Sequence, residues 1–424
     1  MKKKLLSTLL SMVLVGTMLV GCSSKQEAKN DIDKTLDKNK GEEITFMVPD
    51  WGNPGEELIK EFQEETEIKV IVNEVSWNDI RNKVAIAASG GAAAADVIEV
   101  DWSWVGEMNS AGWLEPLDFS DEDKADIPTL ETFSIDGKVL AAPYANDYRI
   151  AYYNKEHFKA AGIDKAPETW DEVYDGLAKI KAAKVVDYPF TMPMNADESA
   201  TTSMMWMAFA RNGVVFNDDN TLNKESVVDA LEFEKKIVDE GLVDPASKTS
   251  SGMDCYRKIT SGEASFMVGP TKFVGISNDP EQCSVLGDIV PILLPGKTGT
   301  SEVTMPLPEA IGVTKFSEHK EAAKKFVEWY TSAETQKKLY AANSSIPTRN
   351  SVLEELINDG TFKNAGAMLD EAKLIKSPFP SGVPDYYSEM SNAIYNNINK
   401  MVLGEISAQE AFDAMNKKVT ELAK

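Results

Sequence analysis

Histidine and cysteine are scarce in this chain of 424 residues. Its two histidines are His157 and His319, and its three cysteines are Cys22, Cys255 and Cys283. Structural zinc sites and His-dependent catalytic triads draw on these residue types. The sequence therefore offers little for either, and we expect no metal centre and no cofactor.

Positive charge is also in short supply. Lys and Arg total 44 against 68 for Asp and Glu, which gives a formal net charge of −24. A surface this negative repels phosphate backbones. We therefore exclude nucleic acid as a partner.

Long apolar runs are absent except at the start of the chain. Three lysines, Lys2 to Lys4, precede an apolar run over 5–21 that is too short for a typical spanning helix and suits a signal peptide. The run ends in Leu19-Val20-Gly21-Cys22, which resembles the bacterial lipobox. This resemblance implies that 1–21 is removed and that lipid on Cys22 anchors the protein to the outer face of the cell membrane. An ordinary signal peptide with a chance cysteine is the alternative.

The stretch 22–43 is polar and charged, with Ile32 and Leu36 as its only sizeable apolar residues. Such a segment cannot nucleate a core, so we interpret it as a tether between the anchor and a folded body. Within that body Cys255 and Cys283 remain. An exported chain allows a disulfide, but a body this large does not need one, and we expect two separately buried thiols.

The body begins with strands alternating with helices. Strands are predicted at 44–48, 68–75 and 96–100, and helices at about 54–65, capped by Asn53, and at 77–88. This order predicts a parallel sheet covered on both faces. A site is expected at the carboxyl ends of the strands, which carry Asp50-Trp51 and Asp101-Trp102.

A second αβ unit follows Tyr148. A strand is predicted at 150–153, and Thr169 with Glu172 three residues later forms a capping box at the start of a helix. The remaining helical patterns cover 156–161, 199–212, 224–240, 320–330, 333–342 and much of 386–424. No internal repeat interrupts the pattern.

Four sequence blocks resemble the family 1 extracellular solute-binding proteins of ABC importers, which include the maltose-binding type. They are ITFMVPDWGNPGEELIKEFQEETEIKV at 44–70, ADVIEVDWSWVGEMNSAGWLEPL at 95–117, GKVLAAPYANDYRIAYYNKEHFKAAGI with PETWDEV within 137–173, and ITSGEASFMVGP at 259–270. The resemblance covers essentially the whole mature chain.

The resemblance implies an α/β, periplasmic-binding-protein-like fold, with two αβ lobes joined by a multi-crossing hinge and a ligand cleft between them. By analogy, one lobe holds 44–146 plus 303–345, and the other holds 147–302 plus 346–424. The implied protein is a monomeric binder, not an enzyme, that delivers an oligosaccharide or other glycoside to ABC permease subunits and their ATPase.

Saccharides present apolar ring faces rimmed by hydroxyl groups, so a saccharide site needs aromatic platforms beside polar side chains. Trp51 and Trp102 follow strand ends, and Asp101 and Ser103 flank Trp102. Because side chains alternate, we expect one of Trp102 and Trp104 to face the cleft and the other the core.

The resemblance adds candidates in the second half of the cleft. Asp147 occupies the turn where the maltose-binding type carries an acidic sugar contact, and Asn146 and Arg149 lie in the same turn. Trp206 lies on a helix that commonly presents an aromatic residue to the cleft. Phe273 stands where many relatives carry Trp. Tyr386 is a further candidate. A packing role is the alternative for Trp51 and Trp206, and a turn stabilised by Asx hydrogen bonds is the alternative for Asp147.

Two other functions stay open. A surface glycoside hydrolase could use Asp101 and Asp147 as a carboxylate pair, although we expect no cleft acid in an apolar setting that raises its pKa. Ferric-ion capture could use the adjacent Tyr386 and Tyr387, because phenolates ligate hard cations.

Overall fold

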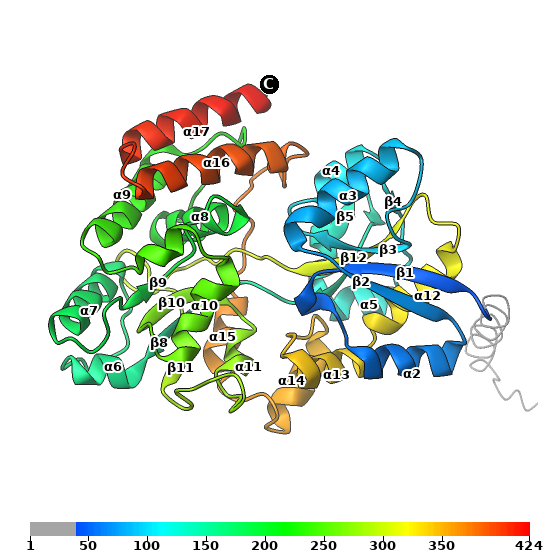
Figure 1. Ribbon diagram of the computed structural model, residues 1–424, viewed down its shortest axis with the longest axis horizontal. Helices are drawn as coiled ribbons and strands as arrows, with labels where there is room; N and C mark the ends of the chain where they lie inside the picture. The colour runs from blue at the N-terminus through cyan, green and yellow to red at the C-terminus, as the bar shows by residue number, and fades with distance from the viewer. Residues whose placement is uncertain (1–39) are drawn as a thin grey trace, which may run out of the picture.

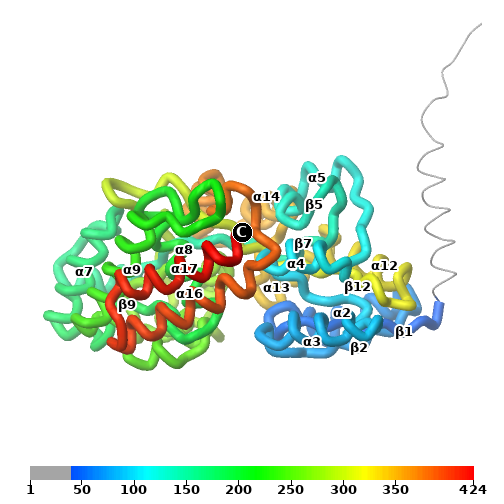
Figure 2. Tube along the Cα trace, turned by 90° about the horizontal axis from the view of Figure 1, so that it is seen from above, coloured from blue at the N-terminus to red at the C-terminus, as the bar shows by residue number. Residues whose placement is uncertain are grey.

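The computed structural model describes residues 40–424, which form two αβ lobes (Figures 1 and 2). The predicted signal segment, Cys22 and most of the tether lie outside these residues. Within the described part, no helix combines the length and the apolar character needed to cross a membrane. The two-lobed α/β architecture is confirmed, and the lobe boundaries stay a prediction.

The sheet of the first lobe is mixed, so the expected all-parallel sheet is wrong. Strand β1 pairs in parallel with β2 and β3, but β12 pairs antiparallel with β3, β4 and β7. The chain reaches β12 from the second lobe and therefore enters the sheet in the opposite direction (Figure 1). The strands are β1 (Glu43–Val48), β2 (Lys69–Glu74), β3 (Val97–Asp101), β4 (Leu114–Glu115), β7 (Ala142–Ala145) and β12 (Glu309–Thr314), with a separate hairpin of β5 (Ser134–Ile135) and β6 (Lys138–Val139).

Both faces of this sheet are buried, as the continuous apolar strands predict. Ile44, Phe46 and Val48 of β1 belong to one apolar cluster, while the intervening Met47 belongs to another. The helical elements around this sheet are η1 (Asp50–Gly52), α2 (Glu56–Thr66), α3 (Trp77–Ser89), α4 (Val105–Ser110), α5 (Asp121–Asp126), η2 (Pro128–Phe133), α12 (Lys320–Tyr330) and α13 (Ala333–Asn343).

The first helix begins later than its sequence predicts. Asn53 does not cap a helix that starts at Pro54. Its Oδ1 instead accepts a hydrogen bond from Gly55 N at 3.0 Å, and α2 starts at Glu56. Gly55 has a φ of 86°, which a helix excludes and glycine tolerates. The short turn η1 is therefore separate from α2, and it carries Asp50 and Trp51 at the end of β1.

The second lobe is built on a four-stranded sheet in the order β11-β8-β10-β9. Its predicted capping box is confirmed: Thr169 accepts from Glu172 N, and the Glu172 carboxylate accepts from Thr169 N. The strands are β8 (Arg149–Asn154), β9 (Phe190–Thr191), β10 (Phe266–Pro270) and β11 (Ile289–Ile292). The helical elements are α6 (Lys155–Ala160), α7 (Trp170–Ala182), α8 (Glu198–Asn212), α9 (Lys224–Asp239), η3 (Pro245–Lys248), α10 (Gly252–Ser261), α11 (Phe273–Ile276), α14 (Asn350–Asn358), α15 (Gly366–Ala372), α16 (Tyr387–Val402) and α17 (Ala408–Leu422).

Several stretches of chain cross between the lobes and are hydrogen-bonded to one another. Asn146 N donates to the Ile346 carbonyl at 2.9 Å, and Leu307 N donates to the Asp147 carbonyl at 2.8 Å. These bonds join segments that are about 160 to 200 residues apart in sequence. They form the multi-crossing hinge that the fold class requires.

Candidate functional site

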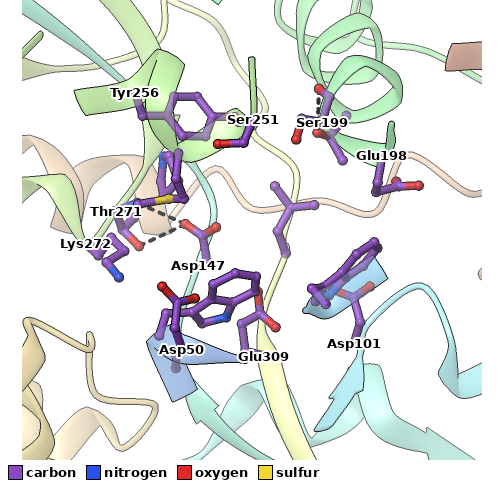
Figure 3. A pocket seen from close by; sticks show the side chains of 18 of the residues that line it. Asp50, Asp101, Asp147, Glu198, Ser199, Ser251, Tyr256, Thr271, Lys272 and Glu309 are labelled. Atoms are coloured by element: carbon purple, nitrogen blue, oxygen red, sulfur yellow. Dashed lines mark hydrogen bonds between the residues drawn. The ribbon is translucent and has the colours of Figure 1, made fainter. Parts of the chain in front are cut away.

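A cavity of about 610 Å³ lies between the lobes, where β1 and β3 end. The predicted residues on its wall are Trp51, Asp101, Trp102, Asn146, Asp147 and Arg149. Figure 3 shows how the labelled side chains surround it, with Asp147, Thr271, Lys272 and Tyr256 toward one side, Asp101 and Glu198 toward the other, and Asp50 and Glu309 along the base. The carboxyl ends of strands thus supply the site, as parallel βα units predict.

Asp147 is held in place from two directions. Its Oδ2 accepts from Arg149 at 2.6 Å, while its Oδ1 accepts from Thr271 N at 2.9 Å and from Thr271 Oγ1 at 3.1 Å. Burial disfavours the Arg149 cation, but Asp147, together with Tyr256 and Glu309, outweighs this and raises the pKa of Arg149 above its usual value. Three of the roughly four acceptor positions of Asp147 are therefore occupied by the protein.

Five buried polar atoms on the cavity wall have no hydrogen-bond partner in the described part of the chain. They are Trp51 Nε1, Asn146 Oδ1, Arg149 Nε, Glu309 Oε2 and Ser345 Oγ. Unpaired buried polar atoms are costly, and in native proteins most find a partner. Donors and acceptors so arranged suit a ligand with many hydroxyl groups.

The cavity acids contradict one expectation from the sequence. Burial raises the pKa of Asp101 to about 6, although hydrogen bonds from Ser103 partly oppose this shift. Burial also raises the pKa of Glu198 and of Glu309 to about 8. The expectation that no cleft acid has a raised pKa is therefore wrong. Near neutral pH, protonated Glu198 and Glu309 can donate as well as accept hydrogen bonds.

Glu309 gains a further neighbour beneath the cavity. Its carboxyl group lies close to that of Glu99. Burial and the neighbouring Glu309 carboxyl group raise the pKa of Glu99 well above its usual value. Glu99 in turn accepts from the Tyr144 hydroxyl at 3.0 Å. Two adjacent carboxyl groups in a dry site share protons because both cannot ionise there.

The tryptophans that follow strand ends divide between cavity and core. Trp51 and Trp102 line the cavity. Trp104 is 4% exposed, its ring lies 4.6 Å from that of Trp77, and it is not on the cavity wall. Trp77, the first residue of α3, also lines the cavity. The sequence pattern did not single out Trp77, although it follows the end of β2 much as Trp51 follows β1.

Four predicted residues lie outside the cavity wall. Ser103 is buried and donates its N–H to Asp101 Oδ1 at 2.8 Å, so it supports a wall residue. Trp206 is buried and stacks on Trp170, with ring centroids 5.8 Å apart, because the helix α8 that carries it packs into the core. The expectation that Trp206 faces the cleft is therefore wrong, and Trp206 is a core residue.

Phe273 and Tyr386 need the same correction. Phe273 is fully buried, with its ring 6.0 Å from that of Tyr256, and it is Tyr256 that reaches the cavity. Tyr386 precedes α16 and packs against an apolar cluster that draws on both lobes, and it does not line the cavity. Its neighbour Tyr387 is buried. Neither tyrosine is placed as a cleft ligand.

Other residues of the cavity wall were not predicted from the sequence. Lys272, Tyr256, Glu198, Glu309 and Ser345 come from separate segments and meet only in the folded chain. In residues 40–424, no group of three or more His, Cys, Asp or Glu side chains is arranged to hold a metal ion. Cys255 and Cys283 are both free and buried, so the expectation of two separate thiols is confirmed.

The family described as bacterial extracellular solute-binding protein matches residues 49–337. A binding protein of Brucella abortus is 26% identical over 359 residues, which cover 82% of this chain and 85% of that protein. The maltooligosaccharide ABC transporter solute-binding lipoprotein of Streptococcus pneumoniae is 25% identical over 430 residues, covering 96% and 93%.

Solved structures with the same fold include maltose-bound MalE3 of T. maritima. The two structures superpose with a TM-score of 0.77 at 22% identity, covering 90% of this chain and 99% of that one. At this identity the likeness shows a shared fold.

Proposed function

Because this chain belongs to the bacterial extracellular solute-binding protein family, we propose that it is the substrate-binding lipoprotein of an ABC importer that captures an oligosaccharide or related glycoside. The maltooligosaccharide-binding relative, which aligns over nearly the whole chain, supports the saccharide class. The bound sugar passes unchanged to the permease and its ATPase.

One observation carries the saccharide proposal: tryptophans and unpaired polar atoms share the wall of one cavity. Trp51, Trp77 and Trp102 bring aromatic surface to the cavity wall, on which sugar C–H groups can pack. The unpaired atoms of Asn146 and Arg149 offer an acceptor and a donor to hydroxyl groups. Because the wall comes from both lobes, a ligand that bridges them stabilises the closed state.

The test is a titration of the soluble body, residues 40–424, by isothermal calorimetry against di- and oligosaccharides. The panel contains α- and β-linked glucose oligomers and galactose, xylose, arabinose and N-acetylglucosamine oligomers. We expect micromolar or tighter binding of at least one member. No binding across the panel would refute the saccharide class.

The anchor is proposed from the sequence, because Cys22 lies outside the described residues. In a bacterial host, the natural chain should fractionate with membranes, and Cys22→Ser should release it. Membrane association that survives this substitution would contradict the lipid anchor.

The raised carboxyl pKa values are also compatible with the alternative function, glycoside hydrolysis. An acid with a pKa near 8 is suited to proton donation in glycoside hydrolysis. Family membership favours a non-catalytic role, in which Glu198 and Glu309 donate hydrogen bonds to the sugar. Prolonged incubation with the bound oligosaccharide distinguishes the two, because new reducing ends would show hydrolysis.

For the ferric-ion alternative, Tyr387 is poorly suited as a ligand. The Tyr387 hydroxyl is buried and donates to Glu198. Burial and the Glu198 charge raise the pKa of Tyr387 well above its usual value. A phenolate ligand is thus disfavoured there.

A further inference from the structure

An aromatic contact between the lobes lies directly behind one wall of the cavity. The Trp102 ring, from the end of β3, lies 5.1 Å from that of Tyr387 and 6.2 Å from that of Phe379, measured between centroids. Trp102 lines the cavity, whereas Tyr387 and Phe379 do not and are only 1% and 2% exposed. Protein therefore fills the space behind Trp102. We call Trp102, Phe379 and Tyr387 the end wall.

The backbone around the end wall also joins the two lobes. The segment that leads into α16 runs beside α4, as both views of the chain show (Figures 1 and 2). Ser110 Oγ of α4 donates to Asp385 Oδ2 at 3.4 Å. A Cβ at Gly106 of α4 would lie only 3.0 Å from the Val383 carbonyl oxygen, so glycine permits this close approach.

Hydrogen bonds fix the end wall to the cavity. Tyr387 OH donates to the carboxyl group of Glu198, which lines the cavity and also accepts from Ser391. The segment that carries Phe379 is held to the second lobe, where the Phe379 and Phe216 rings stack at 4.5 Å. The end wall is therefore a packed, anchored part of the structure.

We propose that the end wall makes this site recognise the terminus of a saccharide chain and exclude chain interiors. An interior segment must leave the site in two directions, and the end wall closes one of them. The terminal ring would lie against Trp102, with its extra hydroxyl group in reach of Asp101 and Glu198. This inference rests on the proposed function and adds which part of the saccharide chain is bound.

The experiment compares a linear oligosaccharide with its cyclic form, which has no chain ends. Maltoheptaose and β-cyclodextrin contain the same number of α-1,4-linked glucose units, but only the former has ends. We expect the wild-type body, residues 40–424, to bind the linear form at least about 100-fold more tightly, which corresponds to about 2.8 kcal/mol. If the panel identifies another linkage, the matching oligosaccharide with free or bulky, blocked ends replaces this pair.

Two variants test whether the end wall causes the discrimination. Gly106→Val should displace the segment near Val383 without altering a cavity residue, and Trp102→Ala should remove the wall itself. Each variant should reduce the ratio of the affinity for the linear form to the affinity for the cyclic form at least about tenfold. Gly366→Val adds the same group where no atom lies within 4 Å, and it should leave the ratio unchanged.

The outcomes separate the two proposals. Failure to bind any saccharide would remove the proposed function and this inference with it. Saccharide binding with equal affinity for linear and cyclic forms would overturn the end wall alone. The role of the end wall is also overturned if Gly106→Val and Trp102→Ala both remain folded and keep the wild-type ratio.

Discussion

Replacing Asp147 with alanine tests the polar side of the cavity most directly. The substitution removes two hydrogen bonds from Thr271 and the ion pair with Arg149, whose side chain is 8% exposed. Hydrogen bonds to a charged group contribute about 1.5–3 kcal/mol each, and water entering the cavity replaces part of the loss. We therefore expect the free energy of unfolding to fall by about 2–4 kcal/mol.

Ligand binding should weaken for a separate reason. Asp147 keeps about one acceptor position for a sugar hydroxyl group, and it orients Arg149, whose Nε is unpaired on the cavity wall. Loss of both effects should cost about 1.5–3 kcal/mol, or roughly 10- to 150-fold in Kd. Calorimetric titration with the best ligand of the panel measures this, and urea denaturation measures stability.

The second lobe contains a matched control. Asp229 accepts from Arg211 at 2.7 and 3.1 Å, and the side chains are 29% and 11% exposed, compared with 19% and 8% for Asp147 and Arg149. Asp229→Ala should destabilise the fold comparably and leave Kd unchanged. If Asp147→Ala also leaves Kd unchanged, or if both variants weaken binding equally, Asp147 is not a ligand contact.

Three further predictions concern single side chains. Trp51→Ala should weaken sugar binding by about 1–2 kcal/mol through lost stacking, measured by calorimetry, and an unchanged Kd would assign Trp51 to packing. Glu234 is fully buried, both of its carboxyl oxygens are unpaired within the described chain, and burial raises its pKa to about 8. Between pH 4.5 and 8 the unfolded chain releases this proton while the folded chain keeps it, so stability should fall as pH rises. Glu234→Gln should remove on the order of 5 kcal/mol of that pH dependence in urea denaturation, and an identical pH profile would contradict the assignment. Because Cys255 and Cys283 are free, a reducing agent should leave the Tm of the body unchanged, and thiol reagents should modify both residues only after unfolding. A Tm that falls on reduction would indicate a disulfide.

The strand-end residues of the site could be predicted from local sequence. Compact apolar runs mark β1 and β3, and the residues that follow such strands in a βα unit lie at one edge of the sheet. Trp51 and Trp102 reach the cavity for this reason. The same logic applies to Trp77, but β2 ends in polar residues and gave a weaker strand signal.

Helix residues were harder to assign because a helix has several faces and its apolar surroundings decide which one is buried. Trp206 lies in α8, in which every residue from Ala200 to Ala210 is buried. Glu198, Ser199 and Thr202 at the start of α8 line the cavity, but the apolar stretch that follows is buried on all sides, so the sequence could not separate packing from binding for Trp206.

Contacts between distant segments lie beyond any local pattern. The end wall joins Trp102 to residues more than 270 positions later, and Glu309 meets Glu99 only through the pairing of β12 with β3. The antiparallel direction of β12 had no local signal either. These features depend on which distant segments meet in the folded chain, and no local stretch of sequence encodes that.

The place of β12 also has a consequence for biosynthesis. This strand sits in the interior of the first sheet, between β3 and β4, yet it is encoded after the whole sheet of the second lobe. A nascent chain that ends near residue 300 leaves β3 as an open edge, with its buried acids facing water. The amino-terminal half therefore cannot finish folding on its own, and the first sheet closes only after the strands of the second lobe have been synthesised.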